Sequence, residues 1–160
     1  MKRILTFAFC LVGWLALLQT GQAQVAYVMA DPELRAALPA CEDMPDMYRE
    51  NCNVRQLRQW VRDHLQYPEE ARTRGLEGRV EVTVLIDTLG QMGSMRLSRK
   101  LDPLLNAEAL RIVQGIKDSG IVWLPAMHHG KKVISEYRIP VNFYLTQPQL
   151  RGADRDQDRR

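Results

Sequence analysis

The stretch RVEVTVLI, residues 79–86, restricts the fold of this 160-residue chain more than any other feature. Apolar residues alternate along it with mostly polar ones, and successive side chains of a β-strand point to opposite faces of a sheet. One face of this strand can therefore be buried while the other meets water, as is common in antiparallel sheets. The expected buried set is Val80, Val82, Val84 and Ile86.

Two further strands are predicted from the same kind of pattern. Asp87-Thr88-Leu89-Gly90 supplies turn residues for a hairpin, and the return strand carries Met92, Met95, Leu97 and Leu101. The stretch VISEYRIPVNFYL, residues 133–145, has polar residues at most even positions. Its odd positions are apolar with the exception of Ser135, and they are Val133, Tyr137, Ile139, Val141, Phe143 and Leu145.

Two amphipathic helices complete the pattern. From Val54, apolar residues recur at helical spacing until Pro68, which ends the first helix. One short helical turn is expected over residues 69–74, closed by Gly75 in a left-handed conformation. The second helix is expected to begin at Asn106 as its N-cap and to end near Gly120.

These elements predict an α+β domain over residues 54–147. Its small three-stranded antiparallel sheet would bury one face under the two helices. The polar stretch RGADRDQDRR mixes charges of both signs, so residues 148–160 are expected to form a disordered polar tail.

The amino terminus has the pattern of a secretory signal peptide. Lys2 and Arg3 precede an apolar run over residues 4–18, and Gly21-Gln22-Ala23 is a small-residue cleavage pattern. Residues 1–23 are therefore expected to be removed, which would route the domain to an oxidising compartment. The alternative is an uncleaved membrane anchor, although the apolar run is shorter than the roughly 20 residues of a spanning helix.

Cleavage would leave two cysteines, Cys41 and Cys52, because Cys10 lies in the signal peptide. An even pair in an oxidising compartment predicts a disulfide, with two free thiols as the alternative. The surrounding residues 24–53 contain three prolines and little periodicity, so we expect an irregular amino-terminal arm pinned by that disulfide.

The chain offers little that resembles a catalytic or cofactor site. The formal net charge is +3, and removal of Lys2 and Arg3 with the signal peptide lowers it to +1. A charge this close to zero argues against nucleic acid as a partner. His128 and His129 are adjacent on a predicted loop, where their rings are expected to point in different directions and to form no metal site. Glu69 and Glu70 are expected to be solvated, so a secreted hydrolase that uses both histidines and either Glu69 or Glu70 is the least favoured hypothesis, and no cofactor is expected.

An open sheet offers a different kind of site. The unpaired N–H and C=O groups of an edge strand can accept an extended peptide. Pro140 favours an edge position for the last strand, because proline lacks a backbone donor and is tolerated mainly at edges or bulges. The alternative is that this strand belongs to the core and that its edge is protected.

Several motifs together resemble the TonB C-terminal domain family in their order and spacing. They are YPEEARTRGLEGRVEVTVLID, DTLG, LNAEALRIV, WLPA, Gly130 and YRIPVNFYL, within residues 57–145. Among their residues, Tyr67, Pro68, Gly78, Trp123 and Pro125 represent the family motif.

The resemblance implies a non-enzymatic periplasmic domain that binds the TonB box, a short segment of an outer-membrane TonB-dependent receptor. The docking edge would be the last strand, with its residues Val133, Ser135, Tyr137, Ile139, Val141, Phe143 and Leu145. The inner-membrane ExbB/ExbD complex is a further partner that the resemblance implies, and a homodimer through the same edge is an alternative. This chain differs from full energy transducers because its apolar start looks cleavable and no long proline-rich spacer follows it.

Overall fold

The computed structural model describes residues 28–145. The predicted signal peptide, residues 1–23, and the predicted polar tail, residues 148–160, lie outside this part of the chain. Its elements, in chain order, are β1 (Val28–Met29), the 3-10 helix η1 (Pro39–Cys41), α1 (Asp46–His64), α2 (Glu69–Thr73), β2 (Gly78–Ile86), β3 (Met92–Arg99), α3 (Pro103–Asp118), β4 (Ala126–His128) and β5 (Lys131–Phe143).

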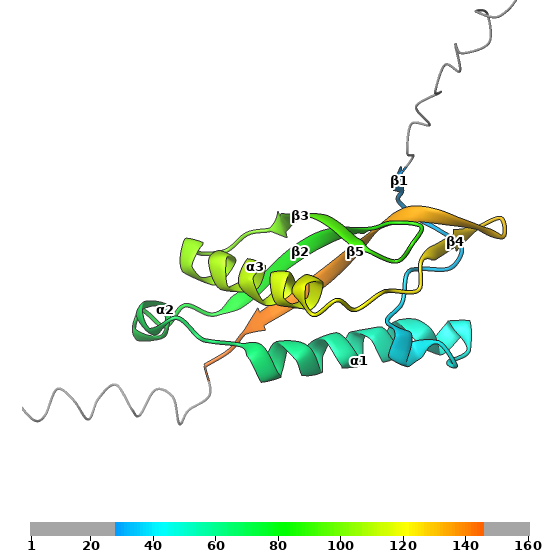
Figure 1. Cartoon of the computed structure of the whole chain (residues 1–160). Helices are drawn as coiled ribbons and strands as arrows, with labels where there is room; N and C mark the ends of the chain where they lie inside the picture. The colour runs from blue at the N-terminus through cyan, green and yellow to red at the C-terminus, as the bar shows by residue number, and fades with distance from the viewer. Residues whose placement is uncertain (1–27, 146–160) are drawn as a thin grey trace, which may run out of the picture.

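Strand β2 lies in the middle of the sheet, which has the order β1-β5-β2-β3 (Figure 1). It pairs antiparallel with β3 on one side and with β5 on the other. The β2–β5 register is continuous from Gly78 opposite Phe143 to Ile86 opposite Ser135. The predicted α+β fold and its central antiparallel strands are therefore confirmed.

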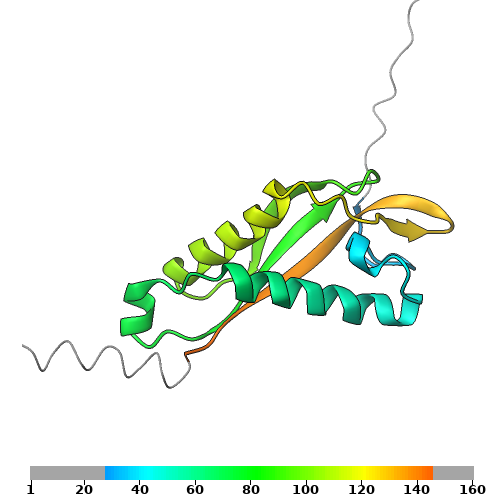
Figure 2. The same cartoon turned by 60° about the horizontal axis from the view of Figure 1, so that its bottom comes forward.

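The two long helices cover the same face of this sheet (Figure 2). The four alternating apolar residues of β2 are at most 1% exposed and point toward this helical layer. Helix α3 contributes its buried stripe, which consists of Leu105, Ala109, Ile112, Val113 and Ile116. The strict alternation in β2 and the helical spacing in α3 thus meet in one hydrophobic core.

The amino-terminal arm is more regular than the sequence suggests. Helix α1 begins at Asp46, well before the predicted start at Val54, and it includes Cys52 and Asn53 on its buried side. The Asn53 side chain accepts a hydrogen bond from the Leu38 N–H at 2.8 Å and donates one to the Ala36 carbonyl at 3.1 Å. Asn53 therefore places a polar side chain at a core position of α1. It interrupts the apolar pattern from which the start of the helix was predicted.

The disulfide between Cys41 and Cys52 is present, as predicted. It joins η1 to α1 with a Cα–Cα distance of 5.8 Å. Both cysteines are buried, so the cross-link also contributes to the core between the arm and the helix.

The predicted start of α3 was wrong. Asp102 is the N-cap, and its side chain accepts a hydrogen bond from the Leu104 N–H at 2.9 Å, with Pro103 in the first turn. Asn106 lies within the helix, where its side-chain oxygen accepts from the Leu101 N–H at 2.9 Å. Both side chains accept hydrogen bonds from backbone N–H groups at this helix terminus. An aspartate directly before a proline is the sequence signal for the true N-cap.

Two short strands were not predicted. Strand β1 pairs parallel with β5 at Ile134 and Ser135, and β4 forms a hairpin with the start of β5. The hairpin turns through His129 and Gly130, whose φ angles of 48° and 70° follow the pattern of a type I′ turn. Both strands are too short to give a period-2 signal, so only tertiary contacts define them.

Gly90 packs directly against the backbone of the loop after α3. Its φ is +80°, and a Cβ at this position would lie 1.8 Å from the Trp123 carbonyl oxygen. The Gly90 carbonyl also accepts a hydrogen bond from the Trp123 N–H at 2.8 Å. The motifs DTLG and WLPA, which both carry the family resemblance, are therefore in direct contact.

We predict that Gly90→Ala lowers the free energy of unfolding by more than about 2 kcal/mol, because both the φ angle and the backbone contact exclude a side chain. Gly120→Ala is the matched control, since Gly120 has a φ of +72° but no atom within 4 Å of the added Cβ. It should cost about 1 kcal/mol. Equal costs in urea denaturation would contradict the proposed clash at Gly90.

We also predict that Cys41→Ala/Cys52→Ala lowers the free energy of unfolding by about 3 kcal/mol, from the entropy of a short closed loop. Urea denaturation of the oxidised protein and the double variant measures the difference. A reduced sample of the unchanged protein is the control and should resemble the variant; no difference among the three would contradict this role.

Candidate functional site

The two edges of strand β5 differ in how far they are paired. Its paired edge runs along β2 over residues 135–143. On the opposite edge, β1 pairs only at Ile134 and Ser135. Within residues 28–145, no strand pairs with that edge from Arg138 to Phe143. Residues 131–133 are paired with β4.

The direction of the backbone groups follows from a single contact on β2. The Glu81 carbonyl accepts a hydrogen bond from the Ser98 hydroxyl of β3 at 3.2 Å, so Glu81 directs its backbone groups toward β3. Its partner in the other register, Pro140, must then direct its own backbone groups away from β2. By the same alternation, Arg138 and Asn142 also direct their backbone groups toward the unpaired edge.

This arrangement explains how a proline fits inside the longest strand. The missing N–H of Pro140 faces the unpaired edge and removes no bond of the β2–β5 ladder. The edge therefore offers the N–H and C=O groups of Arg138 and Asn142, but only the C=O of Pro140.

The side chains assigned to the docking strand by sequence point mostly into the core. Ser135, Tyr137, Ile139, Val141 and Phe143 are buried, and Val133 and Leu145 are half-buried. A partner strand would therefore meet the backbone of β5 and the even-numbered side chains. The sequence pattern already gives Glu136, Arg138 and Asn142 as polar even positions of a half-buried strand, but the predicted docking set left them out in favour of the odd positions.

A polar cavity of about 270 Å³ lies where β1 leaves the edge of β5. It is lined by residues of the arm, α1 and β5, among them Arg35, Glu50 and Arg138. The buried Ser135 hydroxyl, which also lines it, has no hydrogen-bond partner within the described chain. The cavity therefore combines charges of both signs with an unpaired hydroxyl next to the unpaired edge.

Tyr137 connects β5 to α1 at this place. Its hydroxyl donates a hydrogen bond to Glu50 Oε1 at 3.3 Å, and its ring packs against Trp123 with centroids 5.1 Å apart. Burial, followed by the nearby Glu50 carboxylate, raises the pKa of the Tyr137 hydroxyl well above its ordinary value. Tyr137 thus stays a neutral donor over the physiological range.

Tyr67, Pro68 and Gly78 support the far end of β5. The Tyr67 hydroxyl donates to the Leu76 carbonyl, and its ring meets Phe143 edge-on with centroids 5.7 Å apart. Pro68 is the N-cap of α2 and Gly78 begins β2. The YP motif therefore holds the chain reversal that brings β2 beside β5, and it contributes packing to the fold.

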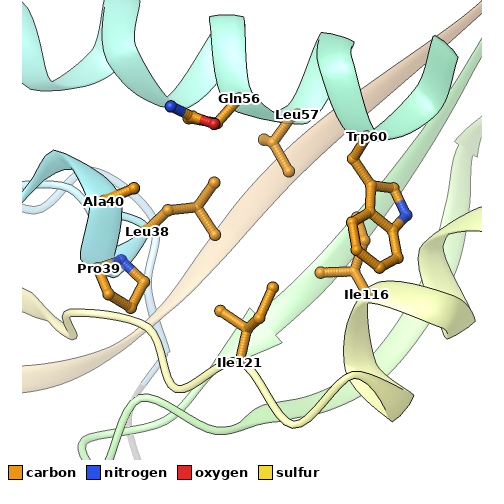
Figure 3. A pocket seen from close by; sticks show the side chains of 8 residues that line it. All are labelled: Leu38, Pro39, Ala40, Gln56, Leu57, Trp60, Ile116 and Ile121. Carbon is orange, nitrogen blue, oxygen red and sulfur yellow. The ribbon is translucent and has the colours of Figure 1, made fainter. Parts of the chain in front are cut away.

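A second, apolar cavity of about 280 Å³ lies between η1, α1 and the end of α3. Figure 3 shows Leu57 and Trp60 of α1 facing Leu38 and Ile121 across it. Its lining comes from the helices, the arm and the loop after α3, and no β5 residue contributes to it.

The two histidines contradict the expectation that their rings diverge. The ring centroids of His128 and His129 are 4.2 Å apart, and the Nδ1 atoms lie 3.9 Å and 3.1 Å from Glu33 Oε1. The left-handed backbone of His129 in the hairpin turn folds its ring back toward His128. Sequence reasoning missed Glu33, which lies in the arm.

The hydrolase hypothesis is not supported by this geometry. Glu69 and Glu70 lie on α2, where they form exposed ion pairs with Arg72 and Arg74. Figure 1 shows α2 and β4 at opposite ends of the domain, so the structure does not bring these carboxylates to the histidines.

The model of the family described as Gram-negative bacterial TonB protein C-terminal matches residues 63–145. The chain belongs to this TonB C-terminal family. The match begins near the end of α1 and includes β2, β3, α3 and β5, so the unpaired edge lies within the part that defines the family.

Two solution structures of the Helicobacter pylori TonB C-terminal domain are similar to this TonB-family domain, at 17% and 21% identity and TM-scores of 0.46 and 0.43. They cover 66% and 59% of this chain and 88% and 95% of their own chains. No match was found among curated proteins. Within the described residues of this TonB-family chain, no helix is both long and apolar enough to cross a membrane.

We predict that the raised pKa of Tyr137 makes this TonB-family domain lose stability in alkaline solution. The unfolded chain ionises near the ordinary value of 10.0, whereas the folded chain holds its proton to higher pH. The contribution of the Tyr137 hydroxyl to the free energy of unfolding is therefore complete below pH 10 and is lost as the pH rises above it. The free energy of unfolding should fall by about 1 kcal/mol from this cause by pH 11.

Urea denaturation as a function of pH measures this loss. Tyr137→Phe has no proton to release and should show a shallower decline between pH 9 and pH 11, whatever its stability at neutral pH. Tyr144→Phe, at an exposed residue, is the matched control. Parallel pH profiles for the unchanged protein and Tyr137→Phe would contradict the prediction.

Proposed function

We propose that this domain binds an extended peptide by strand addition to the unpaired edge of β5. The observation that carries the proposal is the contrast between the two edges of that strand: β2 pairs with residues 135–143 along one edge, and β1 pairs with only Ile134 and Ser135 of the other. Strand addition to an open edge is a recurring mode of peptide recognition.

The peptide class follows from family membership. We propose that the partner is the TonB box of an outer-membrane TonB-dependent receptor, bound in the periplasm in support of energy-coupled transport. The family match over residues 63–145 supports this assignment. Coupling to an inner-membrane ExbB/ExbD complex is part of the same proposal, and it requires the amino terminus to remain as an anchor or another protein to supply the force.

The edge favours recognition through the backbone. The core-facing side chains of β5 are buried, so specificity must come from Arg138, Asn142 and the adjoining polar cavity. Each backbone hydrogen bond contributes about 1 kcal/mol net, so a short added strand gives moderate affinity. Several bonds arranged along one strand share an applied load.

The test is a titration of the ¹⁵N-labelled protein with synthetic TonB-box peptides from the receptors of the same organism. Amide shifts should concentrate at Arg138 and Asn142 and extend toward the polar cavity. Shifts confined to other elements, or none, would contradict binding at this edge.

Two substitutions make the test specific for the backbone. Arg138→Pro removes an N–H from the edge, whereas Arg138→Ala removes the same side chain and keeps the N–H. We predict that the proline variant binds the peptide about fivefold more weakly than the alanine variant, which corresponds to one hydrogen bond of about 1 kcal/mol. Circular dichroism establishes that both are folded, and equal affinities would contradict the proposed register.

The alternative is an interaction or assembly module that uses the same edge to pair with a second copy or an envelope protein. Sedimentation of the purified protein distinguishes it, because an obligate dimer through β5 would occupy the edge. A stable dimer that leaves the peptide unbound would favour this alternative and contradict receptor binding.

A further inference from the structure

Glu33, His128 and His129 form a cluster that peptide binding at β5 does not use. The carboxylate comes from the arm, and both imidazoles come from the β4–β5 hairpin. Their ligand atoms all lie within 4.8 Å of one another. The residues are separated by most of the chain, so the cluster exists only because the arm lies against the hairpin.

Two backbone hydrogen bonds of one β-bridge hold the arm in this place. The Leu34 N–H donates to the Met127 carbonyl at 3.1 Å, and the Met127 N–H donates to the Leu34 carbonyl at 2.8 Å. Leu34 directly follows Glu33, and Met127 directly precedes His128. The backbone therefore fixes the carboxylate opposite the two rings, and the His129 N–H adds a hydrogen bond to Glu33 Oε2 at 3.0 Å.

The His128 ring distinguishes this cluster from an ordinary surface hydrogen-bond network. Its Nδ1 atom is buried and has no hydrogen-bond partner within the described chain. The nearest carboxylate oxygen, Glu33 Oε1, lies 3.9 Å away, beyond hydrogen-bond range. The His128 Nδ1 atom is therefore free to serve as a ligand atom, 3.9 Å from a carboxylate oxygen that can do the same.

A divalent ion of the zinc class fits that gap. Zinc binds imidazole nitrogen and carboxylate oxygen at about 2.0–2.2 Å, so two of its tetrahedral ligands lie roughly 3.3–3.6 Å apart. The two distances from Glu33 Oε1 to the histidine Nδ1 atoms, 3.1 Å and 3.9 Å, bracket this range. Two imidazoles and one carboxylate also match the donor preference of zinc and leave a fourth position for water or an incoming ligand.

We propose that Glu33, His128 and His129 bind one Zn²⁺ ion, which clips the amino-terminal arm onto the β4–β5 hairpin. The arm carries β1, which covers the first residues of the β5 edge. Bound zinc thus holds β1 in place and fixes where the unpaired edge begins. The site stands apart from the proposed peptide contacts, so it does not depend on the proposed function.

The test is a calorimetric titration of the purified full chain with ZnCl₂. Glu33→Gln, His128→Asn and His129→Asn should each weaken binding at this site at least about tenfold. Asparagine is chosen for His129 because it tolerates the left-handed backbone. The matched control is His64→Asn, which removes the third and last histidine of the chain, on α1, and should leave the affinity unchanged.

All variants keep Cys10, so any zinc that this cysteine binds is common to every titration. Zinc binding that is weakened no more by the three ligand variants than by His64→Asn would overturn the site. Absence of binding by the unchanged protein up to about 1 mM Zn²⁺ would overturn it as well.

Hydrogen exchange tests the clip itself. Zinc should slow exchange of the Leu34 and Met127 amides in the unchanged protein and should have no such effect in Glu33→Gln. Both amides bond across the arm and β4, so they report directly on the arm's attachment. Zinc binding without added protection at these two amides would overturn the proposed clipping of the arm.

Discussion

The antiparallel pairing of β2 with β5 holds together everything else in this domain. Its continuous register places the buried faces of both strands on the same side of the sheet, where α1 and α3 cover them. A slip of one residue would turn the buried side chains of the shifted strand to the solvent face, so the hydrophobic layer itself fixes the register. Because β2 occupies one edge of β5 over residues 135–143, only the other edge of that segment has unpaired backbone groups.

The same pairing decides which parts of β5 can take part in recognition. Packing requires the odd-numbered side chains, and the β2 ladder requires the backbone groups of those same residues. The backbone groups and side chains of the even-numbered residues remain available to a partner. Among these residues, Pro140 has no backbone N–H to donate. In the proposed function, a peptide would therefore bind mainly to backbone groups of β5, and selectivity would come from the residues around the edge.

The amino-terminal arm has a larger part in the structure than its irregular sequence indicates. It is attached by a disulfide to α1, by the Asn53 side chain to the helix interior, and by paired backbone bonds to β4. Through β1 it also sets the boundary of the unpaired edge. The arm thus links the helical layer to the hairpin that carries the two histidines.

The sequence by itself determined the central strands, the two long helices, the α+β class and the disulfide. Each of these depends on local periodicity or on a pair of reactive residues, and both are visible along the chain. Tertiary structure decided the rest. Contacts between residues far apart in sequence define the start of α1, the strands β1 and β4, and the Glu33–histidine cluster. Asn53 in the core shows why the sequence did not reveal them. Its hydrogen bonds to Ala36 and Leu38 satisfy a polar group that a pattern of apolar residues cannot identify.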